Sequence, residues 1–179
     1  DPAGSTAGSV YVLYGPRSGS ETGADADLQV TGEASGDYLG SYFTDEVGDI
    51  SGDGIDDLMV EARYHDAGGM TYAGAVYLFY GGTTATTVSA STADVKISGE
   101  DTYAYIGRAV AGLGDFDGDG YDDLGIGYSY YGTANEGGGF VHYGPFTSGA
   151  QVGVETDAGV VFTADTTYDY CGSQVGAAG

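Results

Sequence analysis

The chain has no tryptophan, a single cysteine, three prolines and only four positively charged residues. The lone cysteine, Cys171, excludes a disulfide bond within the chain, so cysteine content says little about the redox compartment. No apolar run approaches the length of a membrane-spanning helix, and no secretory leader is visible. Apolar residues spaced three and four apart are not sustained anywhere, which indicates that helices are scarce.

Acidic residues outnumber basic ones by 27 to four, and the formal net charge is −23. Such a charge repels nucleic acids and anionic membrane surfaces, so neither is expected as a partner. The carboxylates have two possible uses: some can bind metal ions, and the rest can form a solvating surface suited to salty or calcium-rich surroundings.

Glycine and tyrosine are abundant, with 35 and 17 residues. Tyrosine, threonine and valine favour strands, and glycines mark the turns between them. The glycines interrupt apolar runs, a pattern that fits neither collagen nor a flexible linker. The composition therefore predicts an all-β protein.

Three markers recur along the chain with one period. Tyr14, Tyr80 and Tyr143 end similar apolar stretches and lie 66 and 63 residues apart. The other two markers are a Tyr-x-Gly motif and an acidic loop, at residues 35–40, 102–107 and 167–172 and at residues 49–57 and 115–123. Each period of about 65 residues contains four short apolar segments, which predicts four-stranded blades of a β-propeller. A β-solenoid of stacked sheets is the alternative.

The period divides the chain into about 2.7 repeats. Residues 1–32 are predicted to form the second half of a blade, residues 33–98 and 99–163 two full repeats, and residues 164–179 the start of another. A closed propeller needs about four to eight blades. The chain begins with Asp1-Pro2, so we expect a processed product or part of a longer polypeptide, completed by other blades of that polypeptide or by neighbouring copies.

Each acidic loop has the spacing of a calcium-binding loop. Positions one, three, five and nine offer side-chain oxygens, position seven offers a backbone carbonyl, and glycines permit the bend. These hard oxygen donors suit calcium better than zinc or copper. The sequence thus predicts two structural Ca²⁺ sites, with the ligands Asp49, Ser51, Asp53, Ile55 and Asp57 in one and Asp115, Asp117, Asp119, Tyr121 and Asp123 in the other.

The two loops differ at position three, where Ser51 replaces the aspartate found at Asp117. A neutral hydroxyl is a weaker ligand, so loop 115–123 is predicted to bind calcium more tightly. Asp56 and Asp122, at position eight, are expected to be supporting or surface groups. An EF-hand is excluded because position twelve is Val60 or Ile126 rather than a bidentate glutamate.

With these repeats and loops, the chain resembles the FG-GAP repeat of integrin α-subunits and related bacterial surface proteins. The "FG" element corresponds to Leu39-Gly40, Ile106-Gly107 and Cys171-Gly172, and the "GAP" element is degenerate at residues 60–63 and 127–129. The resemblance implies a seven-bladed propeller with calcium loops on one face, usually in extracellular adhesion or recognition.

No catalytic constellation is evident, and the chain is not expected to be an enzyme. His65 and Asp66 are expected to belong to an ordinary polar loop, and a general-base pair is the weaker interpretation. His142 is expected to pack within a strand. Cys171 aligns with apolar residues and is expected to be a small buried one. The tyrosines of the connecting loops could contact partners or sugars; they are Tyr64, Tyr128, Tyr130 and Tyr131.

The leading prediction is a calcium-stabilised propeller segment, extracellular or on the cell surface, that serves adhesion, recognition or assembly with a protein or glycan ligand. A carbohydrate-binding or enzyme-associated module is the alternative. A hydrolase with its site in the central channel is a third possibility.

Overall fold

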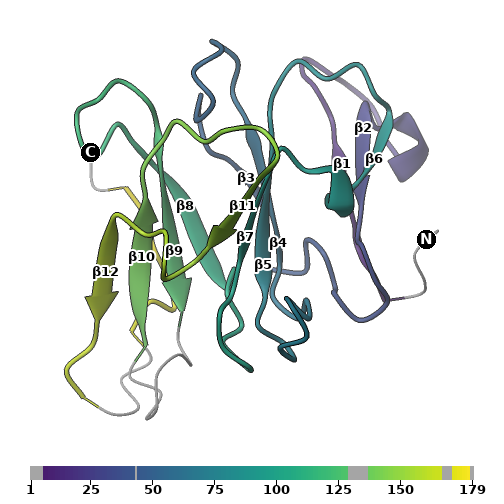
Figure 1. Ribbon diagram of the computed structural model, residues 1–179. Helices are drawn as coiled ribbons and strands as arrows, with labels where there is room; N and C mark the ends of the chain where they lie inside the picture. Colours follow the sequence, from purple (N-terminus) through teal and green to yellow (C-terminus); the bar gives the residue numbers. More distant parts are fainter. Residues whose placement is uncertain (1–5, 43, 129–136, 167–170, 178–179) are drawn as a thin grey trace.

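The computed structural model describes residues 6–42, 44–128, 137–166 and 171–177, and every structural statement refers to these residues. They form strands and two short 3₁₀ turns, with no α-helix among them, and three sheets stand side by side (Figure 1). No helix of the described residues could cross a membrane. Tyr130, Tyr131 and the Thr167–Tyr170 part of the third Tyr-x-Gly motif lie outside the described residues.

The middle sheet contains four antiparallel strands in chain order. This meander arises because each of the four strands pairs antiparallel with the next one in the sheet. Its register places Val60 opposite Tyr77. The strands are β3 (Thr44–Glu46), β4 (Leu58–Ala62), β5 (Ala75–Phe79) and β7 (Val95–Ser98).

The last sheet repeats this arrangement, whereas the first repeat supplies only the third and fourth strands to the first sheet. The last sheet has a bulge between Gly112 and Gly114, where the acidic loop begins. Its strands are β8 (Ala109–Gly114), β9 (Asp123–Tyr128), β10 (Gly138–His142) and β12 (Val160–Thr163), and those of the first sheet are β1 (Ser9–Val12) and β2 (Leu28–Thr31).

Each full repeat contributes the four predicted strands to its own sheet, and it contains one further short strand that joins the preceding sheet. A fifth short strand lies between the third and fourth, and it pairs in parallel with the fourth strand of the preceding sheet. β6 (Thr87–Ser89) extends the first sheet at β2, and β11 (Ala150–Gly153) extends the middle sheet at β7. These segments have little strand pattern in their own sequence. They become strands by pairing with a neighbour that lies about 55 residues away.

Two 3₁₀ turns occupy matching places in the repeat. η1 (Gly23–Asp25) and η2 (Ala90–Thr92) each end two residues before the fourth strand of their repeat. The Ser89 side chain accepts a hydrogen bond from the Ser91 N–H at the start of η2. The turn η2 thereby directs the chain from β6 back into β7.

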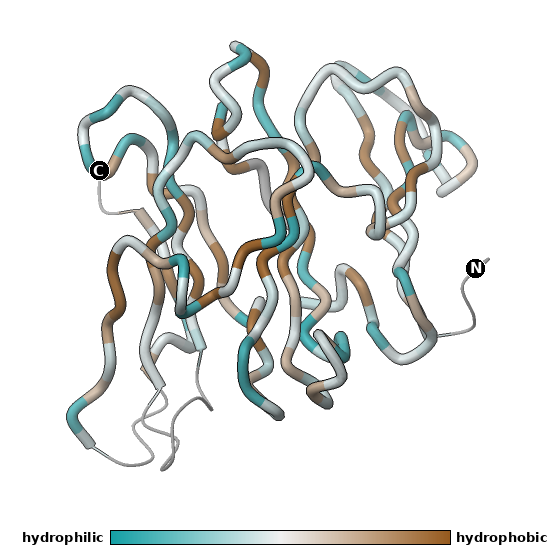
Figure 2. The backbone as a smooth tube through the Cα atoms, viewed as in Figure 1, coloured by the Kyte–Doolittle hydropathy of each residue, from teal (hydrophilic) through white to brown (hydrophobic). Residues whose placement is uncertain are grey.

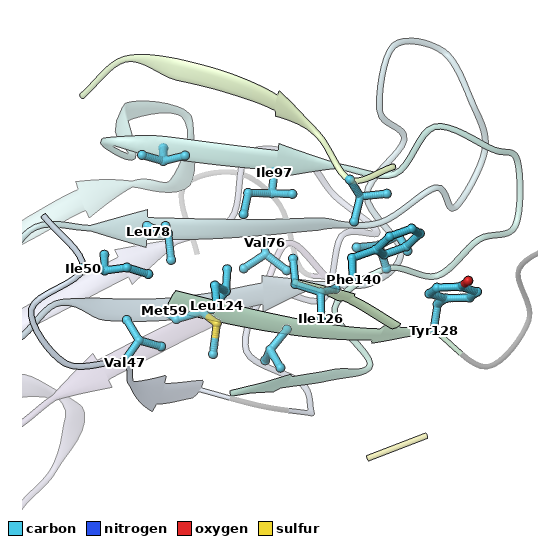
Figure 3. Close-up of a cluster of buried hydrophobic side chains, with 14 of the residues drawn as sticks. Val47, Ile50, Met59, Val76, Leu78, Ile97, Leu124, Ile126, Tyr128 and Phe140 are labelled. Carbon is cyan, nitrogen blue, oxygen red and sulfur yellow. The ribbon is translucent and has the colours of Figure 1, made fainter. Parts of the chain in front are cut away.

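Hydrophobic residues recur along the strands (Figure 2), and the buried ones gather in two layers, one between each pair of successive sheets. One layer joins the first and middle sheets through residues such as Val30 and Tyr77. The other joins the middle and last sheets, and Ile97, Ile126 and Phe140 lie together in it (Figure 3). Burial of this kind stabilises by about 25 cal/mol per Å² of apolar surface. Sheets packed face to face are blades of a β-propeller rather than coils of a solenoid, and here they do not close into a ring.

Candidate metal centre

The loop between β8 and β9 brings three carboxylates together. Oxygen atoms of Asp115, Asp117 and Asp123 lie within 4.8 Å of one another. Asp119 is not part of this group, and its Oδ1 accepts a hydrogen bond of 3.0 Å from the Tyr121 N–H. Three hard anionic donors directed at one point suit a divalent cation such as Ca²⁺.

Backbone N–H groups hold these carboxylates in place. Asp115 accepts from the N–H of Gly118 at 2.7 Å and of Gly120 at 3.1 Å. Asp123 is fully buried, and its Oδ2 accepts from the N–H of Phe116 at 2.7 Å. A carboxylate fixed by its own loop keeps its position before any cation arrives, which lowers the cost of ordering the site.

The loop between β3 and β4 has the same form with one carboxylate fewer. Asp49 accepts from the N–H of Gly52, Asp53 and Gly54 at 2.7 to 2.9 Å. Burial acts to raise the pKa of Asp49, but these donors outweigh it and leave the pKa lowered. Within the described residues, no group of three convergent carboxylates forms in this loop.

Asp57 occupies the ninth position of this loop, as Asp123 does in the other. Its Oδ2 accepts from the Ser51 N–H at 2.9 Å and its Oδ1 from the Gly81 N–H at 2.8 Å. Burial raises the pKa of Asp57 in spite of these two bonds, and the nearby charge of Asp53 adds to the rise. A buried carboxylate whose charge is disfavoured is a good partner for a cation.

All ten predicted ligands lie in these two loops, and the structure adds a contact between the loops. The Asp49 N–H donates to Asp122 Oδ2 at 3.0 Å. A side chain at Gly48 would overlap that carboxylate, and one at Gly52 would overlap the Tyr121 ring. Asp122 was expected to be a supporting or surface group. The structure identifies it as a support for the neighbouring loop, which sequence spacing alone could not indicate.

A second candidate site lies at the other end of the sheets, since β4 leads from the acidic loop to a loop rich in tyrosine. A cavity of about 800 Å³ there is lined by Tyr38, Tyr42, Tyr64 and Tyr72 together with serines and aspartates. The Tyr64 ring contacts the rings of Tyr38, Tyr72 and Tyr105 at centroid distances of 5.5 to 5.8 Å. Tyr64 is therefore part of an aromatic cluster, whereas Tyr128 is buried in the core between sheets.

Backbone strain is concentrated in this tyrosine surface. Among the described residues, the non-glycine residues with positive φ are all tyrosines: Tyr38, Tyr72, Tyr103 and Tyr105, with φ between 52° and 63°. Each such residue costs of order 1–3 kcal/mol, and strain of this kind gathers at functional sites. The Arg63 guanidinium lies over the rings of Tyr42, Tyr64 and Tyr105 at 4.5 to 5.1 Å and helps to hold the cluster together.

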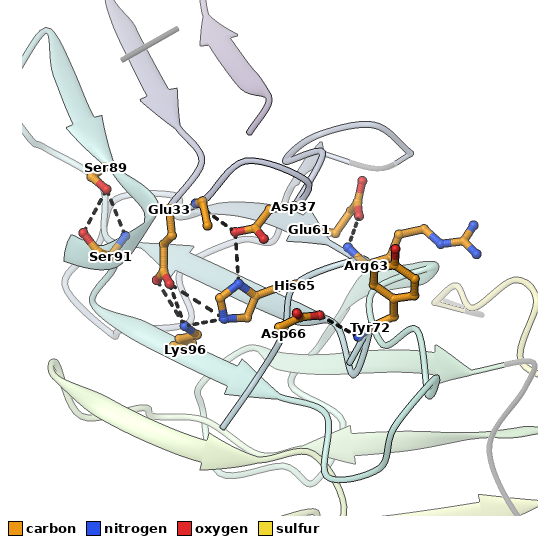
Figure 4. A network of polar contacts seen from close by, with 11 residues as sticks. Glu33, Asp37, Glu61, Arg63, His65, Asp66, Tyr72, Ser89, Ser91 and Lys96 are labelled. Atoms are coloured by element: carbon orange, nitrogen blue, oxygen red, sulfur yellow. Dashed lines mark hydrogen bonds and ion pairs between the residues drawn. The ribbon is translucent and has the colours of Figure 1, made fainter. Parts of the chain in front are cut away.

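The hypothetical pair of His65 and Asp66 does not form. His65 Nδ1 lies 3.0 Å from Asp37 Oδ2, and its Nε2 lies 3.0 Å from Lys96 Nζ (Figure 4). Asp66 instead accepts from the Tyr72 N–H. Both ring nitrogens of His65 are thus engaged, and the imidazole links Asp37 to Lys96 instead of pairing with Asp66.

His142 and Cys171 both lie among the sheets, in surroundings that give them structural contacts. His142 is buried on β10, its Nε2 lies 3.0 Å from the Val154 carbonyl, and burial lowers the pKa of its imidazole. This agrees with the prediction of a packed strand histidine. Cys171 is half-buried rather than fully buried and forms an isolated bridge with Gly137.

In a comparison with known protein families, residues 46–79 match the FG-GAP repeat. The chain is 34% identical to integrin alpha-5 of Xenopus laevis over 125 residues, which is 66% of this chain and 11% of that relative. It is 35% identical to phosphatidylinositol-glycan-specific phospholipase D of Rattus norvegicus over 123 residues, covering 65% of this chain and 14% of the relative. The chain therefore spans only a small part of the length of these relatives.

Proposed function

We propose that this chain, which contains an FG-GAP repeat and is integrin α-like in sequence, is a calcium-stabilised propeller segment for adhesion, recognition or assembly outside the cell or at its surface. The observation that carries the proposal is the convergence of Asp115, Asp117 and Asp123 in a loop whose spacing recurs 66 residues earlier. The similarity to integrin alpha-5 supports the adhesive role. The similarity to the phospholipase D supports the alternative, a module associated with an enzyme.

The donor set fits calcium. Loop 115–123 offers the carboxylates of Asp115, Asp117, Asp119 and Asp123 and the carbonyl of Tyr121, and loop 49–57 offers the equivalent atoms with Ser51 as a neutral member. The ion would offset the repulsion between carboxylates and fasten each loop to its sheet. The roles of these ten residues, and the repeat boundaries at residues 32, 98 and 163, are part of the proposal.

A reciprocal exchange at position three tests the two sites. Asp117→Ser is expected to weaken calcium binding at loop 115–123 at least tenfold, or about 1.4 kcal/mol, because a charged ligand becomes neutral. Ser51→Asp should tighten the other site by a similar factor. Calorimetric titration of the chain with Ca²⁺ measures both affinities, and unfolding curves with and without Ca²⁺ show the linked gain in stability.

The control for this exchange is Asp56→Ala, which removes one acidic charge beside the first loop without removing a proposed ligand. It should leave both affinities within about twofold of the parent chain, since surface charge effects are small. Equal loss from Asp56→Ala and Asp117→Ser would mean that only overall charge attracts the ion. A chain that binds no Ca²⁺ would remove the basis of the proposal.

A carbohydrate-binding role is the second candidate, and the tyrosine cavity is the observation that favours it. Sugar rings stack on aromatic side chains, and the serine hydroxyls and aspartates of the rim can bond to sugar hydroxyls. Glycan-array binding by the parent chain should fall at least tenfold in Tyr38→Ala, which lines the cavity. Tyr103 is exposed to a similar degree and also has a positive φ, but it does not line the cavity. The Tyr103→Ala variant should therefore bind glycans as the parent chain does.

A further inference from the structure

The two acidic loops contact each other through the segments that carry their proposed calcium ligands. The Asp49 N–H, at the first position of loop 49–57, donates to Asp122 Oδ2 at 3.0 Å. Asp122 is half-buried and is flanked in loop 115–123 by two proposed ligands, at positions seven and nine. The contact therefore joins the start of one candidate site to the end of the other, although the two residues are 73 positions apart in the sequence.

Two closer approaches of the backbone accompany this hydrogen bond. The Tyr121 ring packs against Gly52 so tightly that a β-carbon at Gly52 would overlap the ring. The Gly144 N–H donates to Asp123 Oδ1 at 2.9 Å, and a β-carbon at Gly144 would lie 3.4 Å from the Ile50 carbonyl oxygen. The second and fourth positions of one loop thus lie against groups that the seventh and ninth positions of the other loop hold.

Asp49 is the residue around which loop 49–57 is built. Its carboxylate accepts hydrogen bonds from three N–H groups of its own loop, at 2.7 to 2.9 Å. Asp122 fixes the N–H of the same residue from outside the loop. The preceding residue is Gly48, and a β-carbon there would overlap the Asp122 carboxylate. Because hydrogen bonds and tight packing connect these groups, a change in the order of Asp122 reaches the whole of loop 49–57.

Loop 49–57 is the candidate site that gains most from such support. Ser51 offers a neutral oxygen at its third position. Within the described residues, no three carboxylates converge in this loop, whereas three do in loop 115–123. A site with fewer groups already in place loses more conformational freedom on binding. Order that is supplied by the neighbouring loop lowers this cost.

We propose that Asp122 couples the two calcium sites, so that occupation of loop 115–123 strengthens Ca²⁺ binding by loop 49–57. Ligands at positions seven and nine fix the residue between them, and Asp122 then holds the Asp49 N–H in place. Loop 49–57 loses less conformational freedom on binding, which raises its affinity. The effect is reciprocal, because coupling is a property of both binding free energies. The proposal rests on the calcium-binding function proposed above and identifies Asp122 as a positioning residue for the neighbouring site.

Disabling one loop measures the coupling. The double variant Asp117→Ala, Asp119→Ala removes two exposed proposed ligands of loop 115–123. Calorimetric titration should then show that loop 49–57 binds Ca²⁺ about tenfold more weakly than in the parent chain, as is typical of coupled sites. An affinity within about twofold of the parent value would overturn the proposal.

Salt distinguishes coupling through contacts from attraction by the removed charges. Charges on the surface interact over about 8 Å at about 0.15 M salt and over about 3 Å at about 1 M salt. The tenfold difference between the double variant and the parent chain should persist at the higher concentration. A difference that disappears there would overturn the assignment to the contact between the loops.

Variants of Asp122 test its role directly. Asp122→Ala should weaken Ca²⁺ binding by loop 49–57 about tenfold, whereas Asp122→Asn should keep most of the affinity, because the amide oxygen still accepts from the Asp49 N–H. Equal losses in the two variants would overturn the role of this hydrogen bond. The control is Asp56→Ala, which removes the exposed carboxylate at the same position of loop 49–57 and should change neither affinity by more than about twofold. Far-UV circular dichroism checks that each variant is folded, and the double variant tests the coupling with Asp122 unchanged.

Amide hydrogen exchange gives a measurement that does not depend on ion binding by loop 49–57. In the variant Ser51→Ala, Asp53→Ala, Ca²⁺ should occupy loop 115–123 alone and slow exchange of the Asp49 N–H about fivefold. Adding Asp122→Ala to this variant should abolish the slowing. Slowing that survives this change, or no slowing in either variant, would overturn the proposal.

Failure of the coupling and failure of the calcium function give different results. Two loops that bind Ca²⁺ independently of each other reject only the coupling. A chain that binds no Ca²⁺ in either loop rejects the proposed function itself.

Discussion

Replacing Asp123 with alanine is expected to destabilise the protein by about 3–5 kcal/mol, which would unfold a large share of the molecules of a marginally stable domain. Asp123 is fully buried at the start of β9. Its Oδ2 accepts from the Phe116 and Asp117 N–H groups, and its Oδ1 accepts from the Gly144 N–H at 2.9 Å. Truncation leaves three backbone donors without their acceptor and separates the acidic loop from the segment after β10.

The matched control is Asp119→Ala in the same loop. Asp119 is exposed, and its carboxylate accepts a hydrogen bond from the Tyr121 N–H at 3.0 Å. With a chelator present, Asp119→Ala should cost less than about 1 kcal/mol, since water replaces the lost bond. Urea unfolding in chelator and in Ca²⁺ measures both variants. A loss for Asp123→Ala that appears in Ca²⁺ and is absent in chelator would show that Asp123 acts through the ion and not through its backbone hydrogen bonds.

The second large effect is expected for Gly74→Ala, at about 2–5 kcal/mol of lost stability. Gly74 has φ +84° and forms an isolated bridge with Ile106, where the middle sheet meets the following repeat. A β-carbon at Gly74 would overlap the backbone N and O of Ile106. The cost is about 1–2 kcal/mol for the left-handed backbone, and relieving the overlap adds a further 1–3 kcal/mol.

Gly69→Ala separates these two contributions. Gly69 lies in the same loop with φ +86°, and a β-carbon there would meet no atom within 4 Å. It should therefore cost only the backbone term of about 1–2 kcal/mol. Free energies of unfolding from urea titrations give the difference between the two variants. If both lose the same amount, the close approach of Gly74 to Ile106 contributes nothing to stability.

The two ends of the sheets differ in chemistry. The acidic loops lie at one end and are joined through Asp122 to the neighbouring repeat. The tyrosine surface lies at the other end, where the chain accepts backbone strain at Tyr38 and Tyr72. An end held by hydrogen-bonded acidic loops and an opposite end with a strained, exposed tyrosine surface fit the proposed division between stability and recognition, since strained residues persist only where the surrounding structure holds them.

The sequence by itself determined the repeat, the order of the four main strands and the positions of both acidic loops. These features depend on strand alternation and turn residues that act over a few neighbours, and their recurrence near residues 14, 80 and 143 reinforced each local signal. The convergence of Asp115, Asp117 and Asp123 was predictable for the same reason, because the hydrogen bonds that hold this loop lie within nine residues. The ligand roles of Asp119 and Tyr121 stay predictions.

Only the tertiary structure decided the fifth strand of each repeat, the contact of Asp122 with Asp49 and the pairing of His65 with Asp37 and Lys96. β6 lies 56 residues or more from the strand it extends, and the Asp122 contact joins residues 73 apart. Polar segments of three or four residues have no pattern strong enough to predict such partners. The partners of these segments depend on the packing of one sheet on the next, because that packing brings distant backbone groups within hydrogen-bonding distance.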